Sequence, residues 1–284
     1  MRRGYRWRAG SVNAHRDDRL CKTAQSRLIT IASMEQMLEA TAVAEDRHFW
    51  FRGLRRNAQR LLASAISPPG RVDRIVDCGA GTGRNLDWLK TFGPAVGVEL
   101  SPVGLRVGRA QRRPLVRGTV TRLPFRDAMA DVVTSFDVIY CLDDDSERQA
   151  VREMWRVLRP GGVLLLNVAA LEILRGSHSA LTMERRRYGK QQLTRLLTGA
   201  GFVIERMTFT NMVTFPVTLA VRWLERVTGR ADRASDSDLR VPAAPINRAF
   251  DAALLAEHAL LSVIDLPVGT SLMCVARKPR VSAS

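Results

Sequence analysis

The chain has 284 residues, of which 46% are apolar and 25% are charged, and these values exclude a wholly disordered or fibrous chain. A chain of this length can bury the core of one large domain or of two small ones. Lysine and arginine together number 44 against 28 acidic residues, so the net charge is +16. Such an excess is compatible with nucleic acid, an anionic membrane surface or an acidic ligand as a partner.

The cysteines and the apolar runs restrict the class of protein further. The four cysteines lie far apart without a C-x-x-C pair, which disfavours a zinc site and a disulfide framework. No run of about 18 apolar residues is present, so we expect no transmembrane helix. The arginine-rich start lacks the apolar core of a signal peptide. We therefore expect a cytoplasmic protein without a metal site.

The first 33 residues differ from the rest of the chain. Residues 1–33 carry eight basic and two acidic side chains, hence +6 of the net charge, and show little helical or strand periodicity. We expect a basic, disordered arm, with a nucleic-acid-binding arm as the alternative. Apolar residues then recur at helical spacing until a Ser-Pro-Pro-Gly break at 67–70, which predicts a helical cap over 34–66.

Strand and helix patterns alternate through residues 71–210, with short connections between them. The predicted strands are 74–77, 96–99, 115–117, 131–135, 163–168 and 202–210, and the predicted helices are 84–92, 103–109, 146–158 and 191–198. We expect the Arg-Pro-Gly-Gly stretch at 159–162 to end the helix before it. Such alternation predicts a doubly wound α/β sheet. A helical insertion at 211–266, with helices at 213–227 and 246–263, precedes a final strand within 270–277.

A glycine-rich turn between the first strand and the first helix of this core indicates a ligand site. The stretch at 76–83 reads Val-Asp-Cys-Gly-Ala-Gly-Thr-Gly, and Glu99 follows Gly79 by twenty residues. Glycines let the backbone approach a ligand, and the open amides of a helix start face it. A carboxylate at the end of the second strand can accept protons from ribose hydroxyls. The turn therefore predicts a nucleoside cofactor, with an ordinary tight turn as the alternative.

The glycine spacing discriminates between cofactors. A dinucleotide site requires G-x-G-x-x-G, whereas this chain has G-x-G-x-G and carries Arg84 where the third dinucleotide glycine would stand. The carboxylate of Asp77 suits a ligand with a cationic amino group and repels a pyrophosphate. Both features favour S-adenosylmethionine over a nicotinamide dinucleotide, so an oxidoreductase is disfavoured.

Several segments resemble the signature segments of class I S-adenosylmethionine-dependent methyltransferases of the type 11 group. They span residues 74–168 and comprise Asp77–Gly83, Glu99, Leu123–Phe125, Ser135–Val138 and Leu158–Gly162. Further segments resemble a bacterial subfamily of these enzymes, namely His48–Phe51, Arg185–Tyr188, Phe209–Asn211, Phe215–Pro216 and Asp238–Pro242. The resemblance implies a Rossmann-like, seven-stranded sheet with an antiparallel last strand, a methyltransferase domain over 34–284 and S-adenosyl-L-methionine as cofactor.

The resemblance also implies roles for residues that follow the first four strands. Asp77 and the loop of Gly79, Ala80, Gly81 and Gly83 would hold the methionine part of the cofactor, Glu99 the ribose, and Leu100, Ser101, Thr119 and Val120 the adenine, while Ser135 and Phe136 would close the pocket. Three positions depart from the family pattern. Thr119 replaces a common Asp, while Cys141 and Glu184 each stand where relatives carry His.

Methyl transfer from a sulfonium depends mainly on alignment, and it needs a base only where the acceptor carries a proton. His178 matches a His of the family and is a candidate base, with a solvated loop histidine as the alternative. Tyr188, after three arginines, is a candidate residue of the substrate pocket, with a structural anchor as the alternative. We expect methyl transfer to oxygen.

The helix at 213–227 combines apolar residues with Arg222 and Arg226, so it suits a substrate lid or a peripheral contact with a membrane. We expect a small-molecule or envelope lipid or glycan acceptor, and a cytoplasmic protein with membrane association as an alternative. The segment Ser135–Val138 lacks the Asn/Asp-Pro-Pro-aromatic motif of base methyltransferases, which disfavours nucleic acid. A catalytically weakened, cofactor-binding membrane scaffold is the competing hypothesis, because of the three departures from the family pattern.

Overall fold

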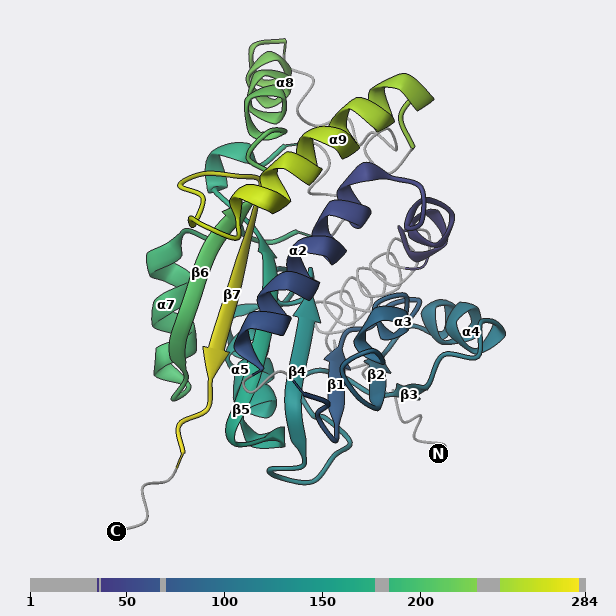
Figure 1. The fold of residues 1–284 in the computed structure, drawn as a ribbon, viewed down its shortest axis with the longest axis vertical. Helices are drawn as coiled ribbons and strands as arrows, with labels where there is room; N and C mark the ends of the chain where they lie inside the picture. Colours follow the sequence, from purple (N-terminus) through teal and green to yellow (C-terminus); the bar gives the residue numbers. More distant parts are fainter. Residues whose placement is uncertain (1–34, 36, 67–69, 177–183, 229–240, 281–284) are drawn as a thin grey trace, which may run out of the picture.

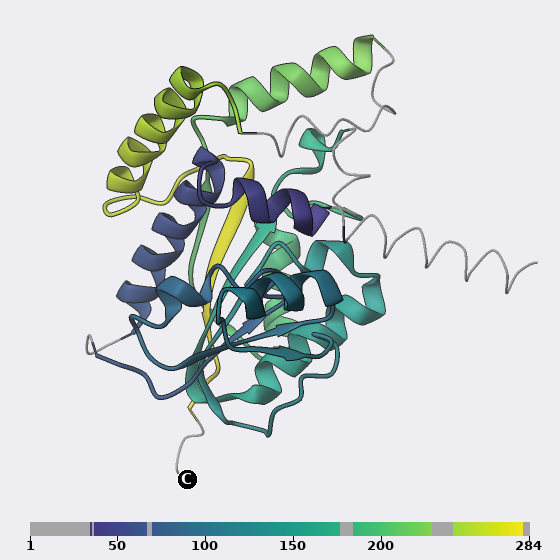
Figure 2. The ribbon, with the colours of Figure 1, turned by 90° about the vertical axis from the view of Figure 1, so that its right-hand side faces the viewer.

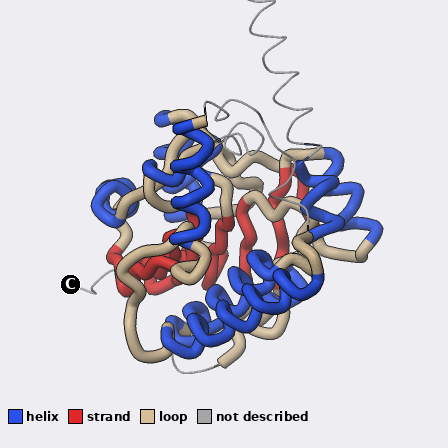
Figure 3. Tube along the Cα trace, turned by 90° about the horizontal axis from the view of Figure 1, so that it is seen from above, coloured by secondary structure: helices blue, strands red, loops and turns tan. Residues whose placement is uncertain are grey.

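A seven-stranded sheet forms the centre of the molecule, with helices on both of its faces (Figures 1 and 3). The computed structural model describes residue 35 and residues 37–66, 70–176, 184–228 and 241–280, so the predicted arm at 1–33 lies outside the described residues. The strands are β1 (Ile75–Cys78), β2 (Ala95–Glu99), β3 (Leu115–Arg117), β4 (Ala130–Phe136), β5 (Leu158–Ala169), β6 (Val203–Thr210) and β7 (Ser271–Arg277). Their order is β3-β2-β1-β4-β5-β7-β6, with β7 antiparallel to both of its neighbours. The predicted Rossmann-like fold is confirmed.

The helices divide the core into two apolar layers. Their bounds are α2 (Phe49–Ala65), α3 (Leu86–Leu89), α4 (Pro102–Ala110), α5 (Asp144–Val157), α7 (Lys190–Gly199), α8 (Phe215–Val227) and α9 (Ala244–Leu260), with short helices η1 (Ile139–Cys141) and η2 (Glu172–Leu174). One layer joins α2 and α3 to the sheet, and the other joins α5 and α7 to the opposite face. The central strands are apolar and buried because both faces are covered, as parallel sheets require.

The start of α5 follows from its sequence, whereas its end differs from the prediction. Asp143 accepts a 2.8 Å hydrogen bond from the Ser146 amide, and the acidic residues of the first turn suit the helix dipole. The helix ends at Val157, but β5 begins at Leu158, directly beside Ala130 of β4. The Arg-Pro-Gly-Gly stretch therefore lies within the first part of β5, and the predicted strand start at 163 was wrong by five residues.

The helical cap is also divided differently from the prediction. Residues 37–44 form one helical segment, the chain turns at 45–48, and α2 begins at Phe49. His48 ends the turn, because its Nδ1 atom accepts a hydrogen bond from the Trp50 amide at the start of α2. The helix predicted at 84–92 contracts to the four residues of α3.

The insertion before β7 contributes α8 and α9, which lie towards the carboxyl ends of the parallel strands (Figure 1). Helix α9 packs on α2, where Asp251 pairs with Arg52 and Arg56, and Leu254 fills the space beside Gly53. Helix α8 stands at the end of the molecule, away from the sheet (Figure 2). Within the described part of the chain, none of the helices combines the length and the apolar character needed to cross a bilayer.

Candidate functional site

The predicted cofactor residues meet at one edge of the sheet. Strands β1 and β4 are neighbours, while the chain continues from β1 to β2 on the other side, so the strand order reverses between β1 and β4. In open α/β sheets, ligands bind outside the carboxyl ends of the strands at this switch point. The glycine-rich loop follows β1, Glu99 ends β2, and Ser135 and Phe136 end β4. The topology therefore brings these three segments together.

The glycine-rich loop has a backbone that only glycine adopts without strain. Gly79, Gly81 and Gly83 have φ values of +73°, +56° and +75°. A Cβ atom at Gly79 would lie 2.3 Å from Val138 Cγ2, and one at Gly104 of α4 would lie 2.6 Å from the Gly81 carbonyl oxygen. The loop is thus pressed between the residues after β4 and the start of α4. It forms a narrow cradle whose shape side chains would destroy.

Glu99 is fixed by the loop it faces. Its Oε2 atom accepts a 2.7 Å hydrogen bond from the Gly81 amide, and its Oε1 atom accepts one of 2.7 Å from the Ser101 amide. Burial raises the pKa of this carboxyl, although the two backbone hydrogen bonds oppose the rise. Each carboxylate oxygen has a second lone pair. Glu99 can therefore hold a diol while it keeps its backbone contacts.

Asp77 carries an unsatisfied buried oxygen at the end of β1. Its Oδ1 atom accepts a 2.7 Å hydrogen bond from the Thr134 hydroxyl, but Oδ2 has no partner among the described residues. Burial raises the pKa of the carboxyl to about 7, with the Thr134 hydrogen bond acting against it. A buried polar atom without a partner is costly. A cationic amino group would satisfy it, so the residues present fit S-adenosylmethionine at this position.

The other predicted cofactor residues lie at the same edge with different degrees of availability. Leu100 is 52% exposed and offers an apolar surface beside Glu99. The Ser101 hydroxyl caps α4 by accepting from the Val103 and Gly104 amides, and the Thr119 hydroxyl is bonded to Thr121. Ser101 and Thr119 thus already use their side chains locally. The last two predicted cofactor residues are Ala80 in the glycine-rich loop and Val120 after β3. Each of them is buried, with 8% of its surface exposed.

Ser135 and Phe136, the two predicted residues at the end of β4, pack against neighbouring parts of the site. The Ser135 hydroxyl donates to the Cys78 carbonyl at 3.0 Å and so joins β4 to the end of β1. The Phe136 ring packs against Trp88, with 6.2 Å between their centroids. Both side chains are buried in this structure, and their part in closing the pocket stays a prediction.

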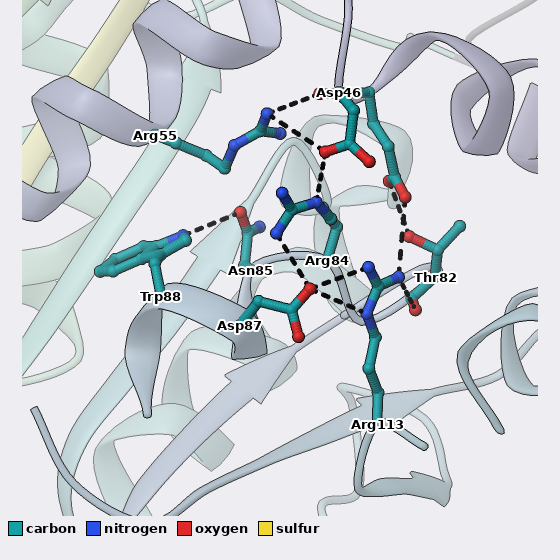
Figure 4. Close-up of polar contacts among 9 residues, drawn as sticks. Asp46, Arg55, Thr82, Arg84, Asn85, Asp87, Trp88 and Arg113 are labelled. Carbon is teal, nitrogen blue, oxygen red and sulfur yellow. Dashed lines mark hydrogen bonds and ion pairs between the residues drawn. The ribbon is translucent and has the colours of Figure 1, made fainter. Parts of the chain in front are cut away.

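The segment before α2 covers the glycine-rich loop, which the sequence alone did not predict (Figure 4). Glu45 accepts a hydrogen bond from Thr82 and lies 3.6 Å from Arg113, while Arg84 bonds to Asp46. Helical residue Leu38 lies over Gly81, at 3.3 Å from the position a Cβ would take. No spacing or motif in the sequence links residues 37–46 to the loop.

The predicted catalytic residues have different outcomes. His178 lies outside the described residues. Tyr188 is fully buried, and its hydroxyl donates to Glu147 on α5, so its position matches the structural-anchor alternative better than a substrate contact. Arg186 also pairs with Glu147, at 3.2 Å, and Arg187 pairs with Glu184 at 2.6 Å. These two arginines are therefore neutralised within the protein.

Two polar residues that the sequence analysis did not single out lie beside the loop. Asp137 follows β4 and Asn167 lies near the end of β5, and their side chains are bonded at 2.9 Å. The signal was available, because a carboxylate directly after a buried strand falls at the ligand edge of the sheet. Among the described residues, no group of three or more histidine, cysteine or acidic side chains is arranged to hold a metal ion.

Comparison with known proteins agrees with this geometry. Residues 76–166 match the family described as "Methyltransferase domain". The chain is 35% identical over 129 residues to a demethylmenaquinone methyltransferase of Roseiflexus sp. (strain RS-1), covering 43% of this chain and 52% of that protein. It is 33% identical over 165 residues to a "probable S-adenosylmethionine-dependent methyltransferase" of Mycolicibacterium smegmatis, covering 56% and 62%. The chain thus spans about half to three fifths of the curated relatives it matches.

A solved structure extends the likeness in fold to most of the chain. A S-adenosylmethionine-dependent methyltransferase of Thermotoga maritima superposes with a TM-score of 0.55 at 19% identity, covering 87% of this chain and 98% of that one. At this identity the likeness concerns the fold, and the match over 76–166 contains the glycine-rich loop, Glu99 and the end of β4. Residues 76–166 therefore match the methyltransferase-domain family, and the chain shares its overall fold with a solved S-adenosylmethionine-dependent methyltransferase.

Proposed function

We propose that the protein is an enzyme that transfers a methyl group from S-adenosylmethionine to a small or lipid-linked acceptor. The observation that carries this proposal is the pair of carboxylates at the switch point. Glu99 is held by two loop amides at 2.7 Å, and Asp77 keeps one buried oxygen without a partner among the described residues. A nucleoside diol and a cationic amino group, both present in S-adenosylmethionine, complement the two carboxylates.

Each part of the site has a role in this reaction. S-adenosylmethionine supplies a methyl group bound to a positively charged sulfur, which already makes it reactive. Asp77, the Gly79–Gly83 loop and Glu99 bind and orient the cofactor, and the segment at 37–46 helps to exclude water from it. Such orientation supplies most of the rate enhancement in a displacement between two bound reactants.

We further propose that the acceptor is lipophilic and is methylated at a hydroxyl oxygen. Relatives are named demethylmenaquinone methyltransferases, a name that supports a lipophilic acceptor but does not support oxygen as the methylated atom. The insertion lies towards the carboxyl ends of the parallel strands, which is also the end that carries the site (Figure 1). An acceptor from an envelope lipid or a lipid-linked glycan would reach the site from this end.

Helix α8 supports a peripheral membrane contact within this proposal. Its large apolar side chains are exposed at Val217, Val221, Trp223, Leu224 and Val227. Arg222 is buried against Glu225, and Arg226 donates to the carbonyl oxygens of Ile173 and Arg175. The apolar face is thus the most accessible part of the helix, which suits insertion into the interfacial region of a bilayer.

The first experiment measures binding of S-adenosylhomocysteine by calorimetry to the wild-type protein, Glu99→Ala and the surface control Glu205→Ala. We expect binding by the wild type and the control, and a loss of at least about tenfold in affinity for Glu99→Ala, because a charged hydrogen-bond acceptor is removed. No heat with the wild-type protein, or equal affinity for Glu99→Ala, would contradict the proposed cofactor site.

The second experiment tests transfer itself. Methyl-labelled cofactor is incubated with a reduced demethylmenaquinone analogue of short side chain, and with phenolic and alcoholic lipids, in detergent micelles. Labelled product that carries the methyl group on oxygen supports the proposed reaction, whereas methylation of a ring carbon of the quinol would support methyl transfer but contradict the choice of oxygen. Cofactor binding without transfer to any acceptor of the panel would favour the non-catalytic scaffold instead.

A further inference from the structure

Asp137 holds an unusual and well-fixed position directly after β4. Its φ value is +60°, in the left-handed region, which aspartate and asparagine adopt more often than other residues with a side chain. Its amide donates to the Asn167 carbonyl oxygen at 3.1 Å, and Asn167 Nδ2 donates to Asp137 Oδ1 at 2.9 Å. Asn167 is itself fully buried. These two hydrogen bonds with Asn167 therefore fix the backbone of Asp137 and orient its carboxyl.

The carboxyl lies on the side of the switch point opposite Glu99. The next residue, Val138, packs so closely on Gly79 that a Cβ there would lie 2.3 Å from it. Ser135, two residues before Asp137, donates a hydrogen bond from its hydroxyl to the Cys78 carbonyl at the end of β1. Asp137 is thus adjacent to the glycine-rich loop, on its β4 side, whereas the ribose position falls on its β2 side. This placement suits contact with the acceptor rather than with the nucleoside.

The charged groups around Asp137 determine whether its carboxyl can accept a proton. Burial raises the pKa of its carboxyl to about 7, and Glu184 raises it further while the Asn167 hydrogen bond and Arg187 lower it. The Arg187 guanidinium donates hydrogen bonds of 2.6 and 2.9 Å to the Glu184 carboxylate, which balances its positive charge. Unlike the buried Glu184, Asp137 keeps part of its surface exposed.

The two remaining titratable neighbours on η1 cannot take a proton at neutral pH. Burial raises the pKa of the Cys141 thiol to about 12, with Asp137 and Glu184 adding to the rise. Burial also raises the pKa of the Tyr140 hydroxyl well above its usual range. Both groups are therefore protonated, and neither can act as a base.

This cluster unites two departures from the family pattern. Cys141 and Glu184 stand where the resemblance places histidines, forty-three residues apart in sequence, and both interact electrostatically with Asp137. A histidine at either position could serve as a neutral base beside Asp137, and this chain has none at these two positions. A carboxyl whose pKa is near 7 can take that role, because the best catalytic base titrates near the working pH.

We propose that Asp137 is a catalytic residue that accepts the hydroxyl proton of the methyl acceptor, with Asn167 as its positioning residue. This inference depends on the proposed methyl transfer to oxygen. As the acceptor O–H bond breaks, its proton moves to a carboxylate oxygen of Asp137. The oxygen lone pair forms the new bond to the methyl carbon, and the electrons of the broken carbon–sulfur bond stay on sulfur. The proton on Asp137 then returns to solvent.

The first test measures the titration of Asp137 without any acceptor. Carbon NMR of protein labelled at aspartate carboxyls is recorded between pH 4 and 9 for the wild type, Asp137→Asn and Asp77→Asn. We expect two signals that titrate near neutrality, one lost in each variant. Titration of Asp137 near pH 4 would overturn the proposal, because such a carboxylate would be a weak base.

The second test compares turnover of the best acceptor of the panel by the wild type, Asp137→Asn, Asp137→Glu and the surface control Asp265→Asn. For Asp137→Asn we expect kcat to fall by about 10²–10⁴-fold and the acid limb of the pH–rate profile to disappear. Affinity for S-adenosylhomocysteine should stay within about twofold, as expected of a group that does not bind the cofactor. Asp137→Glu should restore part of kcat and retain a pH-dependent limb.

The outcomes separate the two proposals. If the wild type turns over and Asp137→Asn retains its kcat and pH profile, the role of Asp137 is refuted while the methyltransferase function stands. If the wild type binds the cofactor but transfers no methyl group, the proposed function fails, and the role of Asp137 fails with it. If Asp137→Asn does not fold, Asp137→Glu tests the proposal instead. This variant moves the carboxyl by one methylene, so an unchanged kcat would also refute the role of Asp137 as the base.

Discussion

The Thr82 hydroxyl donates a 2.7 Å hydrogen bond to Glu45 Oε2, which joins the glycine-rich loop to the segment before α2 (Figure 4). Both residues are buried, and Arg113 approaches the same carboxylate at 3.6 Å. Burial raises the pKa of Glu45, against the effects of Thr82 and Arg113. The segment that covers the loop is therefore fastened by a polar contact rather than by apolar packing alone.

Replacement of Thr82 by valine should weaken this fastening. Thr82→Val keeps the size of the side chain but leaves one buried oxygen of Glu45 without its donor, so we expect a loss of about 1–3 kcal/mol in the free energy of unfolding. The control is Glu39→Gln, which removes an exposed ion pair with Arg106 and should change stability by less than about 1 kcal/mol. Denaturant unfolding measures both, and equal effects would contradict the importance of the buried contact.

The raised pKa of Asp77 predicts how stability changes with pH. Its carboxyl ionises near pH 3.8 in the unfolded chain and near 7 in the folded one. Its contribution is therefore most favourable below pH 3.8 and is lost as pH rises from about 4 to 7, by up to about 1.4 kcal/mol per pH unit. Asp77→Asn removes this dependence.

Thermal denaturation of the protein without cofactor, at several pH values between 4 and 8, measures the difference between wild type and Asp77→Asn. The wild type should lose stability more steeply over this window than the variant. Bound S-adenosylhomocysteine should stabilise the wild type more than Asp77→Asn. Parallel pH curves for the two proteins would show that the Asp77 carboxyl is ionised in the fold at all of these pH values.

Tyr188 should act on stability rather than on catalysis. Tyr188→Phe removes the donor to the buried Glu147, which keeps Arg186 at 3.2 Å, and we expect a loss of about 1–3 kcal/mol in stability. The affinity for S-adenosylhomocysteine and the kcat of the remaining folded protein should be unchanged. A large fall in kcat with unaltered stability would instead support the substrate-pocket role that its position after three arginines suggested.

Exposed apolar residues of α8 should govern binding to lipid. Trp223 and Leu224 are 62% and 56% exposed, so replacing both by glutamine should hardly change the melting temperature. Sedimentation with vesicles that contain anionic lipid should fall by about tenfold or more, since two apolar side chains no longer enter the interface. Leu255→Gln on α9 is the control. Equal sedimentation of all three proteins would exclude α8 as a membrane contact.

The sequence by itself determined the order of strands and helices and the cofactor edge of the sheet. The apolar runs predicted β4 and the second part of β5, because buried parallel strands must be apolar on both faces. The glycines at 79, 81 and 83 fixed the loop because positive φ values exclude most other residues. Glu99 could be placed at the same edge because it ends a strand that the sequence predicts.

Only the tertiary structure decided which side chains remain available at that edge. Asp137 and Asn167 are thirty residues apart, and Thr82 and Glu45 are thirty-seven apart, so no local spacing relates them. Whether Tyr188 faces a substrate or Glu147 depends on how the segment after β5 packs on α5, which sequence periodicity does not specify. Local backbone chemistry can be predicted from neighbouring residues, whereas burial, pairing and pKa arise from contacts that form only when distant segments meet.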